Sequence, residues 1–161
     1  MRRLTFPPLF LLPLAFLTGA ALAAPPANDN FANALVIPSV PASISANNVD
    51  ATLEPGEPNS YIGGGTGGRS VWWQWTAPTS GEVTMQITRS SPTYYPRFGV
   101  FTGPAVGSLT SVASHWDYYS VAFQVVAGTT YHIAIDGGSV STGSSTPVSY
   151  THLTLPTKRI V

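Results

Sequence analysis

Alternation of apolar and polar residues marks two neighbouring segments of the chain as β-strands. In segments 70–76 and 82–89, every second residue is apolar and should face a core. These inward residues are Val71, Trp73, Trp75, Val83, Met85 and Ile87. The sequence Ala-Pro-Thr-Ser-Gly at 77–81 separates the segments and is typical of a turn. Together, the two segments are predicted to form a hairpin.

The same pattern predicts further strands at 35–37, 42–53, 97–102, 109–113, 121–126 and 130–136. The last two are separated only by 127–129, which predicts a second hairpin. It would leave Gln124 and His132 on the outer side of the strands. No window of ten residues after position 23 shows a helical apolar stripe. The pattern therefore predicts an all-β fold, an antiparallel jelly-roll-like β-sandwich of about 7–8 strands.

The N-terminus has the pattern of an export signal. Arg2 and Arg3 precede an uncharged apolar stretch at 4–18, and the small residues of Ala21-Leu22-Ala23 follow. Three prolines interrupt the apolar stretch, which is also shorter than the roughly 20 residues of a membrane-spanning helix. We therefore expect residues 1–23 to be a cleaved signal peptide, and the mature chain to be extracellular or at the cell surface, with the periplasm as an alternative.

One interpretation of the C-terminal residues is that they are not native to the protein. Residues 148–157, Val-Ser-Tyr-Thr-His-Leu-Thr-Leu-Pro-Thr, resemble one translated reading frame of the transposon-end adapter used in DNA library preparation. The sandwich domain would then comprise 24–147, residues 148–161 would be a non-native tail, and the native final strand would be missing. An exposed sheet edge would result. The alternative is an ordinary last strand at 149–155, where polar and apolar residues partly alternate.

Charge is unevenly distributed along the chain. The whole chain carries 7 Lys and Arg against 7 Asp and Glu, and it has no cysteine. Residues 24–147 contain three arginines, no lysine and seven acidic residues, a net charge of −4. Nucleic acids and anionic membranes require clustered basic residues, so neither is expected as a partner.

Five sequence blocks, taken in order, resemble a known family. They are 28–34 (NDNFANA), 51–58 (ATLEPGEP), 70–78 (SVWWQWTAP), 100–103 (VFTG) and 127–137 (AGTTYHIAIDG). The series, over about 28–138, resembles the bacterial pre-peptidase C-terminal domain. This resemblance implies a secreted, jelly-roll-like accessory module without catalytic activity, joined to proteases or other exported proteins. Some members bind calcium, polysaccharide or fibrous protein. The chain departs from the family at 114–119, where relatives tend to be rich in Asp and Asn.

Several carboxylate and amide side chains lie where a calcium site could form. Asp29 and Asn30 precede the first predicted element, Glu54 and Glu57 flank a Pro-Gly pair, and Asp136 ends a strand. Calcium prefers oxygen ligands of this kind, often presented by loops. The alternatives are that these residues are solvated loop side chains, or that Asp29 or Asn30 caps a short turn at 31–35.

Aromatic residues outside the alternating strands form the candidate binding site. They are Tyr94, Tyr95, Trp116 and Tyr118, with Asp117 among them. Flat rings beside a carboxylate suit stacking on sugars or apolar side chains. Alternatively, these rings cover one end of the core. Trp72, which points away from the predicted core, is either exposed or covered by the N-terminal segment.

No catalytic motif stands out. Gly63, Gly65 and Gly68 match a nucleotide-binding spacing, but they lead directly into a strand rather than a helix, so we interpret them as a loop. His132 and Asp136 could join a serine in a triad, but nothing in the sequence selects that serine.

The sequence therefore predicts a non-catalytic secreted module that mediates binding or adhesion to a polysaccharide or an extracellular protein. Calcium is the one cofactor considered, as a stabilising ion. Two alternatives stay open. The chain could be the accessory part of a secreted protease or glycosidase whose catalytic domain lies beyond residue 147, or a structural repeat of a surface protein.

Overall fold

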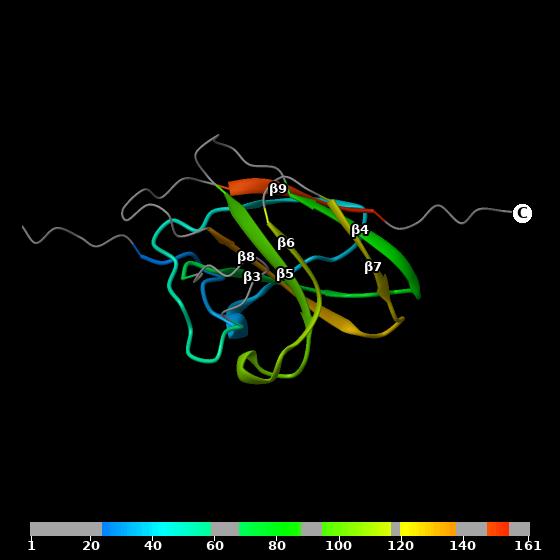
Figure 1. Ribbon diagram of the computed structural model, residues 1–161, viewed down its shortest axis with the longest axis horizontal. Coiled ribbons are helices and arrows are strands. Elements are labelled where there is room, and N and C mark those ends of the chain that lie inside the picture. Colours follow the sequence, from blue (N-terminus) through cyan, green and yellow to red (C-terminus); the bar gives the residue numbers. More distant parts are fainter. Residues whose placement is uncertain (1–23, 59–67, 88–94, 117–119, 138–147, 155–161) are drawn as a thin grey trace, which may run out of the picture.

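The chain folds into two β-sheets that lie face to face (Figure 1). The computed structural model describes residues 24–58, 68–87, 95–116, 120–137 and 148–154. The five-stranded sheet contains, in spatial order, β1 (Leu35–Val36), β3 (Val71–Thr76), β8 (Thr130–Gly137), β5 (Pro96–Thr102) and β6 (Thr110–Trp116). The four-stranded sheet contains β2 (Ala42–Ala46), β9 (Val148–Thr154), β4 (Gly81–Ile87) and β7 (Ser120–Val125).

The predicted sandwich class is confirmed. Apart from the short parallel pair of β1 and β3, neighbouring strands are antiparallel. Two three-residue 3₁₀ helices, η1 (Phe31–Asn33) and η2 (Val106–Ser108), complete the described elements. No helix within the described part of the chain has the length and apolar character needed to cross a membrane. The predicted signal peptide lies outside the described residues.

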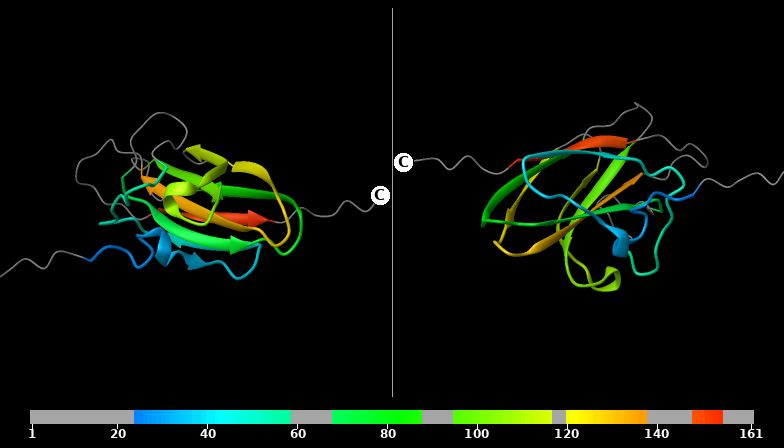
Figure 2. Two further views of the ribbon diagram at one scale, coloured as in Figure 1. Left: turned by 90° about the horizontal axis from the view of Figure 1, so that it is seen from below. Right: turned by 180° about the vertical axis from the view of Figure 1, so that it is seen from behind.

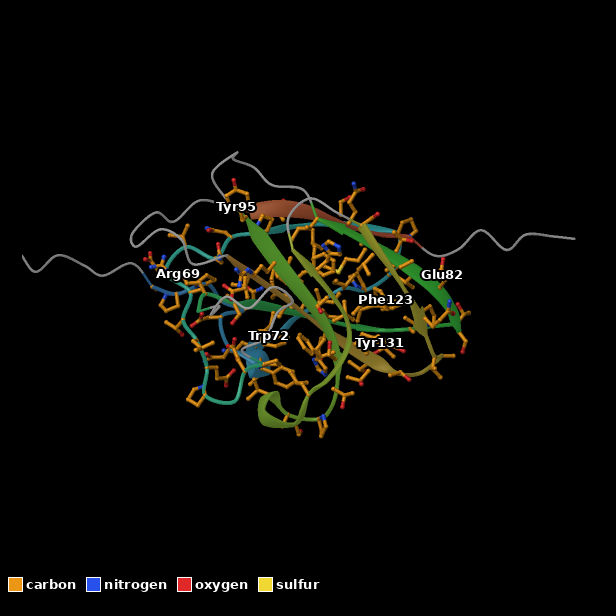
Figure 3. All side chains as sticks on the ribbon, in the orientation of Figure 1. Arg69, Trp72, Glu82, Tyr95, Phe123 and Tyr131 are labelled. Carbon is orange, nitrogen blue, oxygen red and sulfur yellow. The ribbon has the colours of Figure 1, made fainter. Side chains whose placement is uncertain are left out.

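The core between the sheets is built from the residues that the alternation placed inward. Trp73 and Trp75 are 5% and 2% exposed, and Met85 is fully buried. The ring centroid of Tyr131 is 6.0 Å from that of Trp75 and 6.3 Å from that of Phe123. Figure 3 labels Tyr131 and Phe123. Aromatic packing thus joins β3 and β8 of one sheet to β7 of the other.

Both predicted hairpins are wrong. β3 pairs with β8, and β4 pairs with β7, so each predicted partner belongs to the opposite sheet. The links 77–80 and 126–129 run side by side between the sheets: the Ala77 amide donates to the Thr129 carbonyl, and the Gly128 amide to the Ala77 carbonyl, at 3.0 and 2.8 Å. Alternation shows only that a strand buries one face, and facing sheets satisfy that requirement as well as a hairpin does.

Two strand bounds also differ from expectation. β2 ends at Ala46, so most of the predicted strand 42–53 is an irregular connection. β6 continues to Trp116, which the sequence had placed in a loop. Backbone pairing with β5 explains the extension, because Trp116 is the register partner of Arg97.

Residues Val148–Thr154 form a strand, β9, between β2 and β4. His152 is the register partner of Ser43 on one side and of Gln86 on the other. The position expected to lack a strand is therefore occupied, and the edges of this sheet are β2 and β7. The non-native origin of residues 148–161 stays a prediction.

A smaller apolar cluster covers the outer face of the five-stranded sheet. Trp72 is fully buried there, with Phe31 of η1 packed edge-on at 5.3 Å between ring centroids. Phe101 and Ala134 complete its buried part. Figure 2 shows the N-terminal segment, in blue, along this side of the sandwich. Of the two alternatives for Trp72, cover by the N-terminal segment is confirmed.

Candidate functional site

The two ends of the sandwich are built differently. At one end β3, β5 and β7 begin and β4, β6 and β8 finish, as the pairs Arg97–Trp116, Pro96–Gly137 and Gln86–Ser120 show. We call this the loop-bearing end, because segments 59–67, 88–94, 117–119 and 138–147, which lie outside the described residues, adjoin these strand ends in the sequence. The opposite, turn end contains links 77–80 and 126–129. In Figure 3, Tyr95 and Arg69 lie toward the loop-bearing end and Glu82 toward the turn end.

Asp136 anchors the start of β3 at the loop-bearing end. Its side chain is 0% exposed, and its two carboxylate oxygens accept the amides of Gly68 and Arg69 at 3.0 and 3.1 Å. Burial raises the pKa of the Asp136 carboxyl, while these amides, that of Gly137 and the nearby Arg97 guanidinium oppose the shift. The carboxyl therefore holds the main chain where the Gly-rich segment joins β3.

Glu57 forms a second anchor beside it. Its carboxylate accepts the Ser70 hydroxyl at 2.5 Å and the Glu54 amide at 2.9 Å, and the side chain is 5% exposed. Burial raises the pKa of Glu57; the hydrogen bonds from Ser70 and Glu54 and the indole of Trp72 oppose this, and the negative charge of Asp136 adds to it. The buried Trp72 indole nitrogen nevertheless has no regular hydrogen-bond partner among the described residues. Glu57 thus ties residues before and after segment 59–67.

The remaining candidate calcium ligands hold the N-terminal segment. Asp29 accepts the amide and hydroxyl of Thr52 at 2.6 and 2.7 Å, and Glu54 accepts the Phe31 amide at 2.9 Å. Asn30 precedes η1 without a side-chain cap, so the predicted capping is wrong for both Asp29 and Asn30. Each of the four carboxylates accepts hydrogen bonds from the chain itself.

Metal binding by these residues stays a prediction. Within the described ranges, no group of three or more His, Asp or Glu side chains is arranged to hold a metal ion. Glu57 and Asp136 do lie near enough to repel one another. The structure therefore brings two of the five candidates into one cluster.

The candidate aromatic site is only partly within the described residues. Tyr95 immediately precedes β5 and is 43% exposed. Trp116 ends the neighbouring strand β6, and its register partner is Arg97, two residues after Tyr95. Tyr94, Asp117 and Tyr118 lie outside the described residues. An exposed ring and two strand termini therefore meet at the loop-bearing end.

The possible triad of His132 and Asp136 is ruled out by position. Both lie on β8, four residues apart, which at about 3.3 Å per residue is about 13 Å. His132 packs against Phe31 with 4.5 Å between ring centroids, and burial lowers its pKa although the Gly103 carbonyl opposes the shift. His132 therefore packs with the outer apolar cluster, whereas Asp136 holds the main chain at the start of β3.

Sequence reasoning missed two residues that complete the anchor. The side-chain amide of Asn48, 4% exposed, donates to the Arg69 carbonyl at 3.0 Å. Asn28 exchanges hydrogen bonds with the Trp72 main chain at 2.8 and 3.0 Å. Both contacts span more than 20 positions, so no local pattern indicated them. Residues 28–31, 48–57, 68–72 and 136 thus form one polar network.

Comparisons with known proteins give weak structural likenesses. No protein-family model matches the chain, and no curated protein matches it. CorA, a surface-associated copper-binding protein of Methylomicrobium album BG8, is 8% identical with a TM-score of 0.48, covering 76% of this chain and 98% of that one. Xyl-CBM35, solved with a disaccharide containing glucuronic acid, is 16% identical with a TM-score of 0.37, covering 71% and 94%. The CBM35 of Cellvibrio japonicus Abf62 is 15% identical with a TM-score of 0.35, covering 72% and 95%. The fold of this chain is a jelly-roll-type β-sandwich.

Proposed function

We propose that the chain is an exported, non-catalytic module that binds a polysaccharide or an extracellular protein surface at its loop-bearing end. The observation that carries the proposal is the placement of Tyr95. Its ring is 43% exposed where two strand ends meet, beside a main chain held by buried carboxylates. A rigid scaffold that presents an exposed aromatic ring beside loops is a common design for binding sites.

The proposal also draws on the sequence. The five blocks resemble the pre-peptidase C-terminal domain, whose members are non-catalytic modules of exported proteins. The N-terminal pattern of Arg2, Arg3 and an apolar stretch supports export. The same role fits an accessory part of a secreted hydrolase and a repeat of a surface protein.

A pull-down assay tests the proposal. The purified chain is mixed with insoluble polysaccharides and with collagen fibres, and the bound fraction is measured. Replacing Tyr95 or Trp116 with alanine should weaken binding at least about twofold, since stacking of one ring contributes about 0.5–1.5 kcal/mol.

The matched control is Val126→Ala, which truncates a side chain that is 61% exposed at the turn end. It should bind like the unmodified chain. If both aromatic variants bind as well as Val126→Ala, the loop-bearing end is not the binding site.

A further inference from the structure

We propose that the loop-bearing end recognises the carboxylate groups of an acidic polysaccharide, with Arg69 as the side chain that binds them. This inference rests on the proposed binding function and names the class of its ligand. Arg69 and Arg97 are the two Lys or Arg side chains within the described ranges. Figure 3 shows Arg69 at this end, and Arg97 lies there by its register with Trp116 and Asp136.

The two arginines differ in their surroundings. Arg97 is the register partner of the buried Asp136, and its positive charge opposes the rise that burial causes in the pKa of that carboxyl, so it partly balances an internal negative charge. Arg69 is exposed, and among the described residues no acidic side chain forms an ion pair with its guanidinium. The charge of Arg69 is therefore directed to solvent.

The main chain of Arg69 is held firmly on both sides. Its amide donates to Asp136 and its carbonyl accepts from Asn48, and these two side chains are 0% and 4% exposed. Burying a carboxylate is costly unless hydrogen bonds compensate for lost hydration. The fold thus uses two buried polar side chains to fix the backbone of one exposed arginine.

This arrangement suits a carboxylated sugar polymer. A guanidinium binds a carboxylate through two parallel hydrogen bonds, and Tyr95 at the same end offers a ring face for a sugar. Glu82 is exposed at the opposite end, where it would repel an anionic polymer. The described carboxylates at the loop-bearing end, Asp136 and Glu57, are buried and hydrogen-bonded within the chain, so Arg69 is the exposed charge there that an anionic polymer would meet.

The test compares two forms of one polymer. Binding of the chain to polygalacturonate and to its fully methyl-esterified form is measured by affinity electrophoresis at low and high salt. We expect binding to the acid form at least about tenfold tighter, weakened by salt because an exposed charge carries it. The Arg69→Gln variant should lose that preference, while its exposed position leaves the melting temperature unchanged.

A control separates a local contact from overall charge. Thr79→Glu, at an exposed position of the turn end, makes the net charge more negative by the same one unit. It should keep the preference for the acid form. Equal binding of both polymer forms, or equal weakening by Arg69→Gln and Thr79→Glu, would overturn the inference.

The outcome also separates this inference from the proposed function. If the chain binds both polymer forms equally and Tyr95→Ala abolishes that binding, the module binds polysaccharides but does not recognise their carboxylate groups. If it binds neither form but retains collagen fibres, the ligand is a protein and the inference is wrong. Failure to bind any polymer or fibre contradicts both.

Discussion

At the loop-bearing end and at the turn end, main-chain groups next to the strands obtain their hydrogen-bond partners in different ways. At the turn end, links 77–80 and 126–129 satisfy each other largely through main-chain hydrogen bonds, helped by the Ser80 and Tyr131 hydroxyls. At the loop-bearing end, buried side chains supply the acceptors instead. The carboxylates of Asp136 and Glu57 accept hydrogen bonds from residues that flank segment 59–67.

The two ends therefore differ in what they cost the stability of the fold. Neutral main-chain pairs close the turn end without burying charge. Two carboxyl groups with raised pKa values hold the loop-bearing end, which costs stability because each charge loses hydration. Such a cost is expected at functional sites, where geometry is favoured over stability. The comparison can be tested by removing each kind of support in turn.

The largest expected effect comes from removing the carboxylate of Asp136. Asp136→Ala leaves the Gly68 and Arg69 amides without their acceptor, and should lower the free energy of unfolding by about 2–3 kcal/mol. Asp136→Asn retains one acceptor oxygen and should lose about half as much. Chemical denaturation measures both. Glu82→Gln, at an exposed turn-end position, should change stability by less than about 0.5 kcal/mol. Equal stability of Asp136→Ala and Glu82→Gln would show that the anchor has no structural role.

The second effect tests the turn end. The hydroxyl of Tyr131 accepts the Val126 amide at 2.9 Å, and Tyr131→Phe removes this acceptor while keeping the ring. The variant should lose about 1 kcal/mol, one partly buried hydrogen bond. Hydrogen exchange should become faster at Val126 and stay unchanged at Arg69. Faster exchange at both amides would mean that the two ends are not independent.

The sequence predicted the strands far better than their partners. Alternation identified β3, β4, β7 and β8 and most of their inward residues, because burial of one face is a local requirement. Assignment of each strand to a sheet depends on how the faces meet across the core, and no local pattern contains that information. Both hairpin errors follow from this limit.

The candidate site shows the same limit. Loop carboxylates such as Asp29 and Glu57 were recognisable as candidates for a role, but a carboxylate that accepts backbone amides has the same local sequence as one that binds calcium. Their partners Thr52 and Ser70 lie 23 and 13 positions away. Only the fold shows which groups meet.

A smaller effect concerns pH. Because burial raises the pKa of Glu57 above its ordinary 4.5, the folded state holds this proton more tightly than the unfolded state. Its contribution to stability is therefore greatest at acidic pH, and it falls as the pH rises from about 4.5 through the raised value. Glu57→Gln keeps an acceptor for Ser70 and removes this dependence. The variant should be more stable relative to the unmodified chain at pH 8 than at pH 4, measured by melting temperature. A difference in stability that does not vary with pH would mean that Glu57 titrates as it does in the unfolded chain.

The smallest expected effect is that of calcium, which would bind between Glu57 and Asp136 and relieve their repulsion. Calcium sites of extracellular modules bind with dissociation constants of about 0.1–1 mM, so 2 mM calcium at a 1 mM site would add about 0.6 kcal/mol to the free energy of unfolding. The melting temperature should rise in calcium relative to a chelator, and Glu57→Gln should abolish the rise, whereas Glu82→Gln should preserve it. An unchanged melting temperature would mean that hydrogen bonds alone compensate the two carboxylates, and the loop-bearing end would then be held by the chain's own donors, as the turn end is.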